Sequence, residues 1–451
     1  MTIQTTNRAA LSRLRVREGM QHTKPGKPEV CCMEKIMTRS GISRLTGCAA
    51  FSILAMMSAV PAASADSGSA KIDSFEAALT GGKFTANFRY RYEMVEQSGL
   101  PEDARASTLR SRLGYHTGQF EGFSAMIEAE DIRDIGDDDY NSTTNGKVRF
   151  PVVADPDETE INQAFIDYTG LPGTKIVAGR QRIKLDNDRF IGNVGFRQNE
   201  QTFDALRIDN TSLTDISATY VFIDNVNRIF GSDSPIGDHE MTSHLFNVSY
   251  SGWSPAKITG YAYLLDYDNL FALSTQTYGL RAAGKHKLND EVTLHYTGEY
   301  AHQSDFDNNP AGFDHDYYLA ELGVTAKGIT AKAGYEVLSG DGTTALQTPL
   351  ATGHKFNGWA DKFLVTPVSG LADSYVSLSG QFMGVKLLGA YHMFDGDSGG
   401  ADLGDEVNLL AKKTFRKRYT TELKGAFYEA GRPVFGLTDT DRIWFSFIVK
   451  I

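Results

Sequence analysis

Three pairs of arginine residues two positions apart lie between residues 83 and 184 of the 451-residue chain. The pairs are Arg89 and Arg91, Arg110 and Arg112, and Arg180 and Arg182. A guanidinium is a planar fork of N–H donors that fits a carboxylate through two parallel hydrogen bonds. Side chains two residues apart on a β-strand point to the same face. These pairs therefore predict rows of anion-binding groups on neighbouring strands.

The segment around the first pair has the alternation of an amphipathic strand. In residues 83–94, apolar and aromatic side chains alternate strictly with polar ones. The apolar face holds Phe84, Ala86, Phe88, Tyr90, Tyr92 and Met94, and the polar face holds Lys83, Thr85, Asn87, Arg89, Arg91 and Glu93. A period of two is that of a strand, because a helix would scatter both sets around its circumference.

Eighteen segments of this kind are predicted between residues 83 and 451, among them 121–131, 174–184 and 441–451. Short connections such as Lys327-Gly328 alternate with long ones such as 132–158, 185–202 and 339–373. No stretch after residue 65 holds the roughly 18 consecutive apolar residues of a spanning helix. The pattern predicts an all-β transmembrane antiparallel barrel in the outer membrane, with short periplasmic turns and long extracellular loops.

The N-terminal region has the features of a secretory signal. Basic residues Lys35, Arg39 and Arg44 precede an apolar run at 49–60, and Ala63-Ser64-Ala65 follows it. This order predicts cleavage before Asp66. We therefore expect three regions: residues 1–65 as a removed extension and signal peptide, residues 66–82 as a periplasmic lead-in, and residues 83–451 as the barrel.

Charge and cysteine content exclude several classes of site in the processed chain. All three cysteines lie before residue 66, so no disulfide or cysteine-metal site is expected. Removal of residues 1–65 leaves 36 Lys and Arg against 53 Asp and Glu, a net charge of −17. Nucleic-acid binding needs a basic surface and is not expected. No motif for a cofactor or a catalytic metal is present, and none is predicted.

Strand parity assigns many of the charged side chains to the barrel lumen. The inward bases expected on the first six strands are Lys83, Arg89, Arg91, Arg110, Arg112, Arg180, Arg182, Lys184 and Arg207, and the inward acids are Glu93, Glu128, Glu130 and Asp167. The later strands are expected to be balanced. One wall of the lumen is therefore predicted to be basic, although arginines in a lumen also brace it by pairing with acids such as Glu128 and Glu130.

The middle of the chain resembles a known family. Gly179-Arg180-Gln181, Arg189, Gly192, Arg197 and Phe203-Asp204 resemble the signature of the alginate export family of outer-membrane barrels. Residues 354–363 and 110–115 resemble two further segments of that family. The resemblance implies an eighteen-stranded barrel with an arginine-rich lumen, and the best-known member passes a polyuronate out of the cell.

These observations predict a channel that passes an anionic polysaccharide, or a small anionic or polar solute, along an arginine-lined path. The expected path residues are Arg89, Arg91, Arg110, Arg112, Arg180, Arg182, Arg189, Arg197 and Arg207. Expected partners are outer-membrane lipid, lipopolysaccharide and the barrel assembly machinery. The alternative is an uptake porin for small acids or sugars, and a barrel enzyme using His295 or His302 is the weaker rival.

Two loop regions carry separate predictions. Segment 185–202 holds Arg189, Arg197 and two glycines within the family motif, and we expect it to fold into the barrel and narrow the pore. The acidic runs at 137–139, 305–316 and 395–397 lack the ligand spacing of a calcium loop. We expect them to be solvated, or bridged to lipopolysaccharide through divalent ions.

Overall fold

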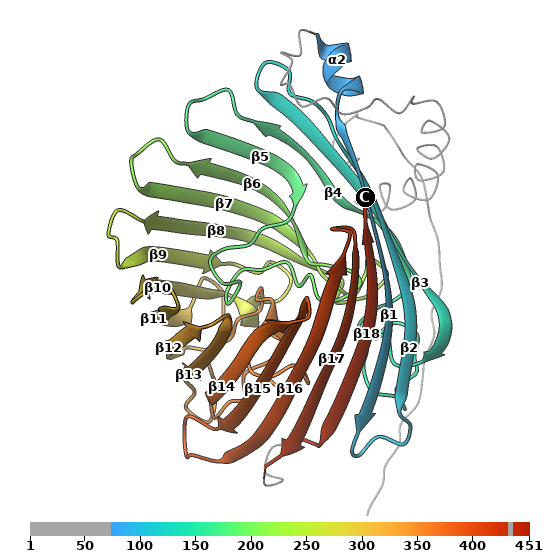
Figure 1. Ribbon diagram of the computed structural model, residues 1–451, viewed down its shortest axis with the longest axis vertical. Helices are drawn as coiled ribbons and strands as arrows, with labels where there is room; N and C mark the ends of the chain where they lie inside the picture. Colours follow the sequence, from blue (N-terminus) through green and yellow to red (C-terminus); the bar gives the residue numbers. More distant parts are fainter. Residues whose placement is uncertain (1–73, 432–435) are drawn as a thin grey trace, which may run out of the picture. The chain divides into compact units, whose positions relative to one another are not determined.

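The computed structural model describes residues 74–431 and 436–451, which form one sheet of eighteen strands closed on itself (Figure 1). Every strand pairs antiparallel with its neighbours in sequence, and β1 pairs with β18 to close the barrel. The strands are β1 (Lys83–Gln97), β2 (Ala104–His116), β3 (Phe123–Asp139), β4 (Glu158–Tyr168), β5 (Thr174–Gln181), β6 (Thr202–Asn210), β7 (Ile216–Asn227), β8 (Asp238–Tyr250), β9 (Ala256–Leu265), β10 (Thr275–Lys287), β11 (Val292–Asp305), β12 (Asp314–Ala326), β13 (Ile329–Leu338), β14 (Leu371–Phe382), β15 (Val385–Asp395), β16 (Asp402–Phe415), β17 (Tyr419–Ala430) and β18 (Thr440–Lys450). The predicted eighteen-stranded antiparallel barrel is confirmed.

The connections differ sharply between the two ends of the barrel. At one end the turns are short, and the two tightest consist of Lys327-Gly328 and Met383-Gly384, all four residues with positive φ. Such two-residue turns match the twist of a hairpin. At the other end lie the three longest loops, residues 140–157, 182–201 and 339–370. Short turns mark the periplasmic end of a bacterial barrel, and long loops mark the extracellular end.

The lead-in to β1 contains a short helix, α2 (Phe75–Thr80). Ser74 caps it by accepting a hydrogen bond from the backbone N–H of Ala77, and Tyr115 of β2 donates to the carbonyl of Leu79 at 2.6 Å. The predicted cleavage site and residues 1–65 lie outside the described residues. Among the residues that are described, no helix is long and apolar enough to cross a membrane.

Two of the predicted strand ends that differ from the structure change the placement of charged residues. Strand β3 was expected over 121–131 but continues to Asp139, so the acidic run 137–139 extends a strand instead of forming a loop. Strand β5 was expected to reach Lys184 but ends at Gln181, where the chain leaves the wall. We call residues 182–201 the strap and residues 339–370 the second lumen loop.

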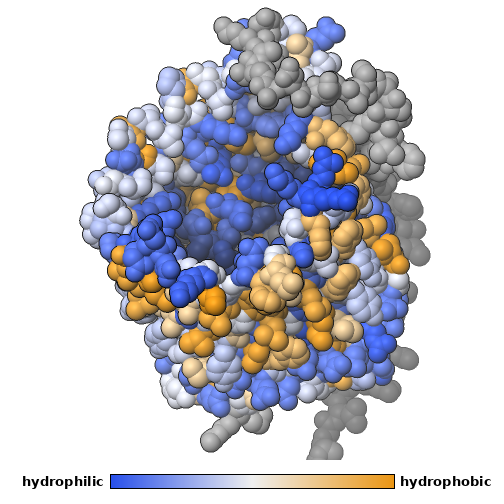
Figure 2. Space-filling view, viewed as in Figure 1, coloured by the Kyte–Doolittle hydropathy of each residue, from blue (hydrophilic) through white to orange (hydrophobic). Residues whose placement is uncertain are grey.

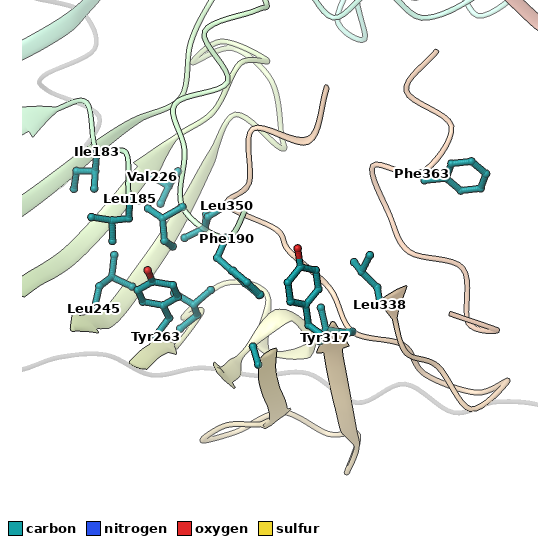
Figure 3. Close-up of a cluster of buried hydrophobic side chains, with 14 of the residues drawn as sticks. Ile183, Leu185, Phe190, Val226, Leu245, Tyr263, Tyr317, Leu338, Leu350 and Phe363 are labelled. Atoms are coloured by element: carbon teal, nitrogen blue, oxygen red, sulfur yellow. The ribbon is translucent and has the colours of Figure 1, made fainter. Parts of the chain in front are cut away.

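The strap and the second lumen loop pack inside the barrel against an apolar part of its wall. Ile183, Leu185, Phe190 and Ile191 of the strap are buried in one cluster with side chains of the wall, as Figure 3 shows for several of them. The wall contributes Val226, Leu245, Tyr261, Tyr263 and Tyr317, and the second lumen loop contributes Leu346, Leu350 and Phe363. The strap therefore crosses the interior of the barrel, as predicted for 185–202.

The outer face and the interior differ in polarity as a transmembrane barrel requires. Large apolar side chains such as Leu322 and Leu378 are more than half exposed on the outer face. Figure 2 shows a hydrophilic hollow bordered by short turns, with hydrophobic side chains gathered on the wall over β14–β17. The outward apolar residues supply the surface that meets lipid.

Candidate functional site

Four arginines form a basic wall on the first two strands. Arg89 and Arg91 lie on β1, Arg110 and Arg112 lie on β2, and Arg89 is directly opposite Arg110 in the ladder. All four are at most 7% exposed. The alternation of these strands sends them inward, as predicted. We call these four residues the basic wall.

The basic wall holds one part of the strap through main-chain carbonyls. Arg89 donates to the carbonyl of Gly195 at 3.1 Å, and Arg91 donates to that of Phe196 at 2.6 Å. Arg110 and Arg112 each donate to the carbonyl of Gln198 at 3.3 Å. We call residues 193–198 the tip of the strap. The basic wall and the tip are therefore joined by several N–H donors acting on neutral acceptors.

Acidic side chains compensate part of this positive charge. Arg112 forms an ion pair with Glu130 and lies 2.9 Å from Glu200 of the strap. Arg182 pairs with Glu128 and also with Glu200. Burial by itself raises the pKa of Glu200, but Arg112 and Arg182 hold that pKa below its usual value. The pairing of Glu128 and Glu130 with arginines, left open by the sequence, is present.

Arg197 joins the tip to three separate parts of the molecule. Its guanidinium lies 3.0 Å from Glu93 of β1, 3.1 Å from Asp361 of the second lumen loop and 3.8 Å from Asp155 of the 140–157 loop. Burial lowers the pKa of Arg197, yet the three carboxylates raise it above its ordinary value. The arginine therefore works as a junction between loops, and its charge is neutralised there.

Arg189 has a similar bracing position on the other side of the lumen. Its Nε lies 2.8 Å from Glu336 of β13, and its guanidinium donates to Asn357 at 3.1 Å and to Thr348 at 3.3 Å. Burial lowers the pKa of Arg189, but the Glu336 carboxylate raises it by more, so the pKa lies above its ordinary value. Arg189 ties the strap to the second lumen loop.

The remaining predicted arginines are divided between the two faces of the sheet. Arg207 is opposite Val177, which is buried, and it pairs with Asp209 at 2.9 Å on the lumen side. Arg180 is three residues from Val177 and is opposite Asp204, with which it forms a two-pronged ion pair. Three residues is an odd step along a strand, so Arg180 points to the outer face. The prediction that Arg180 lines the lumen is wrong. It placed Arg180, Arg182 and Lys184 in one inward row, but the strand ends at Gln181.

A cavity of about 410 Å³ opens beside the basic wall, below the tip. Four arginines and two lysines line it, together with only two carboxylates. The charged lining residues are Arg89, Arg91, Arg110, Arg112, Lys412, Lys450, Glu200 and Glu422. Nη1 of Arg91 and Nε of Arg110 form no hydrogen bond with the described residues, and their ion pairs with Asp155 and Glu130 are long, at 3.6 and 3.8 Å. The cavity can therefore accept additional negatively charged oxygen atoms.

The predicted path residues did not include a second cluster that fixes the tip from above. His354 of the second lumen loop stacks on Phe196 at 3.4 Å between ring centroids and bonds to Asp361 at 2.7 Å. Lys424 of β17 lies 3.7 Å from the ring centroid of Trp359. Burial lowers the pKa of His354 to about 3. The family segment 354–363 was the sequence signal for this cluster, but its contacts across the lumen have no counterpart in sequence spacing.

Comparisons with known proteins agree with this geometry. The alginate export family model matches residues 82–360. No curated protein sequence matches the chain. Among solved structures, OccAB2 of Acinetobacter baumannii superimposes with a TM-score of 0.68 at 15% identity, covering 83% of this chain and 98% of that one.

Two Pseudomonas aeruginosa structures have the same fold. OpdL superimposes with a TM-score of 0.63 at 13% identity, covering 83% of this chain and 99% of its own. OccK9 (OpdG) gives 0.66 at 10% identity, covering 83% and 100%. At these identities the likeness concerns the fold alone. Since the family model spans more than half of the sequence, this chain belongs to the alginate export family and is an outer-membrane β-barrel channel.

Proposed function

We propose that the channel passes anionic solutes along the basic wall, through the cavity beneath the tip. The observation that supports this most strongly is the lining of that cavity, in which six cationic side chains meet two carboxylates. An entering carboxylate would meet guanidinium groups that otherwise donate to main-chain carbonyls, as Arg89 does to Gly195 and Arg91 to Phe196. Charge-assisted hydrogen bonds of this kind are stronger than those to neutral carbonyls.

The local charge outweighs the negative charge of the whole chain. Charges in outer loops are screened over about 8–10 Å at physiological salt. The cations of the cavity lie on the path itself and act on each solute that passes. Conduction also requires that each contact be weak enough to release the solute. A row of neighbouring cations meets that need, because the solute can exchange one for the next.

The test uses the two lysines of the cavity, since the arginines also hold the tip and their loss would disturb it. We expect Lys412→Gln/Lys450→Gln to move the reversal potential in a potassium chloride gradient toward cation preference. Lys332→Gln is the matched control. Lys332 of β13 pairs with Glu321 of β12 at 2.8 Å, as Lys412 pairs with Glu422, but it does not line the cavity. Cation preference in the unaltered channel, or equal shifts in both variants, would refute the proposal.

The size of the solute is a separate question on which the strap bears. Its tip lies directly over the cavity and is held by all four arginines of the basic wall. A polysaccharide needs a continuous opening, whereas a small acid can move past a partial obstruction. This arrangement favours passage of small acids, as in the uptake alternative, over passage of a polymer. Liposome swelling with galacturonate and with oligogalacturonates of increasing length separates the two, because export predicts entry of the longer chains.

The rival reading as a barrel enzyme rests on His295 and His302. His295 bonds to Thr325 at 2.8 Å, and His302 bonds to Asp316 at 3.1 Å. A serine nucleophile would need a histidine base within hydrogen-bond reach. The first contact joins a histidine to a threonine hydroxyl, and the second joins a histidine to a carboxylate.

A further inference from the structure

An apolar groove runs along the outer face of the barrel near the short-turn end. Its volume is about 700 Å³, and it crosses from β13 to β18. The apolar side chains that line it are Ile329, Leu378, Phe382, Leu387, Leu409, Leu423, Phe427 and Ile443. Several of them are more than half exposed, including Leu378 and Phe382. The groove lies on the face that meets lipid.

Glycines give the groove its depth. Gly380, Gly389 and Gly425 line it on β14, β15 and β17. A Cβ added at Gly389 would have Leu409 as its nearest neighbour, at 3.7 Å, so the space above this glycine is open. Small residues on a lipid-facing strand let an elongated apolar chain approach the backbone closely. The wall is therefore shaped for more than a smooth contact with bulk lipid.

A cluster of cations lies at the periplasmic end of the groove. Lys413 is two residues beyond Ala411, which lines the groove, and therefore lies on the same outward face. Arg416, Lys417 and Arg418 form the turn that follows β16. Nζ of Lys413 reaches the carbonyl of Met383 in the neighbouring turn at 3.3 Å. We call these four cations the basic turn.

The basic turn has no acidic residue of its own to neutralise it. The nearest carboxylate in the sequence is Glu422, which faces the lumen and pairs with Lys412 at 2.8 Å. Exposed aromatic side chains, Phe382, Phe415 and Tyr419, flank the turn. Aromatic girdles mark the level of the lipid headgroups in such barrels. The four cations are therefore at the height of a phosphate group in the periplasmic leaflet.

We propose that this groove and the basic turn together bind an anionic phospholipid of the periplasmic leaflet. Its acyl chains lie in the groove, and its phosphate contacts the basic turn. Clustered Lys and Arg next to an apolar membrane surface recognise anionic headgroups in this way. Lipopolysaccharide lies in the opposite leaflet, beyond the reach of these cations.

A second copy of the chain is the other occupant to consider. A two-fold contact through the groove, with its axis along the membrane normal, would bring two basic turns to the same level. Like charges placed together disfavour that contact. A lipid phosphate instead neutralises them. The charge of the turn therefore favours lipid over a second barrel.

The experiment compares lipid retained by the full chain after gentle detergent extraction from outer membranes. Bound phosphatidylglycerol per barrel is measured by native mass spectrometry. Each basic residue near an anionic surface strengthens binding by about fivefold. Lys413→Gln/Arg416→Gln/Lys417→Gln/Arg418→Gln should therefore lose nearly all of the bound lipid. The control Lys287→Gln/Lys327→Gln, which alters other periplasmic turns, should retain it.

A second variant tests the groove separately. Gly389→Leu places a side chain where the acyl chain would lie, and it should lower retention while leaving the basic turn intact. Heat-modifiable migration in gels checks that each variant is a folded barrel. Equal phosphatidylglycerol retention in the unaltered chain and the basic-turn variant would overturn the proposal. The proposal would also be overturned if the unaltered chain were a dimer and Gly389→Leu abolished the dimer instead of the bound lipid. That result would identify a second copy as the occupant of the groove.

Discussion

The strap meets two walls of very different character. On one side its first half, Ile183–Ile191, packs into a cluster of tyrosine, leucine and valine side chains. On the other side its tip meets guanidinium groups that donate to peptide carbonyls. The first contact excludes water, whereas the second borders a cavity lined by charged groups. The same segment is thus anchored by burial at one end and by polar contacts at the other.

This contrast separates positioning from conduction. Burial of apolar area is indifferent to which solute passes, so the first half of the strap fixes where the segment lies. The contacts of the tip are with the same arginines that an anion would bind. A solute therefore competes for groups that also shape the passage. Perturbing each end should give different phenotypes.

The largest effect is expected from deletion of residues 188–198, which removes the tip and Phe190 together. The lumen loses its main obstruction, so single-channel conductance in planar bilayers should rise severalfold. A deletion within the 306–313 loop, which connects β11 and β12, is the control. If the folded deletion variant conducted like the unaltered channel, the strap would not be a constriction.

Replacement of Phe190 tests the apolar side alone. Phe190 is 8% exposed, and its ring lies 5.4 Å from that of Tyr317 and 5.5 Å from that of Tyr261. Phe190→Ala should destabilise the packed strap by about 3 to 5 kcal/mol, as for other buried phenylalanines. Hydrogen exchange of strap amides measures this loss. The control Phe246→Ala removes an outer-face ring that is 45% exposed, and it should leave the protection of the strap amides unchanged. Equal loss in both variants would contradict the assignment of Phe190 as an anchor.

A smaller, pH-dependent effect is expected where His354 stacks on the tip. Burial lowers the pKa of His354 to about 3, whereas an unfolded histidine titrates near 6.5. Below pH 6.5 the open state therefore binds a proton that the packed state does not, and packing weakens as pH falls. Between pH 6.5 and 5 the loss is about 2 kcal/mol.

Hydrogen exchange of the second lumen loop, corrected for the intrinsic pH dependence of exchange, measures that loss. His354→Gln keeps a polar group against Asp361 and cannot titrate in this range. Protection of the second lumen loop in this variant should therefore not change with pH. A slope in the variant equal to that of the unaltered chain would assign the pH dependence to another group.

Sequence periodicity was sufficient for the wall of the barrel and insufficient for its interior. Alternation places Arg89, Arg91, Arg110 and Arg112 inward because each lies within a long regular strand. Arg180 directly follows Gly179, whose φ is 121°, and is one residue from the end of β5 at Gln181. The inward row expected for Arg180, Arg182 and Lys184 runs past the end of β5, so the last two residues could not indicate the face of the strand, and Arg180 was assigned to the wrong one.

Contacts inside the lumen join residues that are far apart in sequence. Arg189 pairs with Glu336, and Arg197 pairs with Asp361, through loops whose paths no period describes. Asp155 was not recognised as a partner of Arg197, since its segment reads as an ordinary polar loop. The acidic run at the end of β3 was predicted to be a loop because of its charge. In the structure Asp138 and Asp139 are paired with Ala106 and Arg105 in the ladder.

The pairing of β1 with β18 has a consequence for the order of folding. Glu93 of β1 receives Arg442 of β18 at 3.1 Å, and the same carboxylate holds Arg197 of the strap. Glu93 therefore obtains its full set of partners only after the two ends of the chain have met. Contacts of such wide sequence separation form slowly. The interior should thus become rigid as a late event of biogenesis, after an open sheet has closed into a ring.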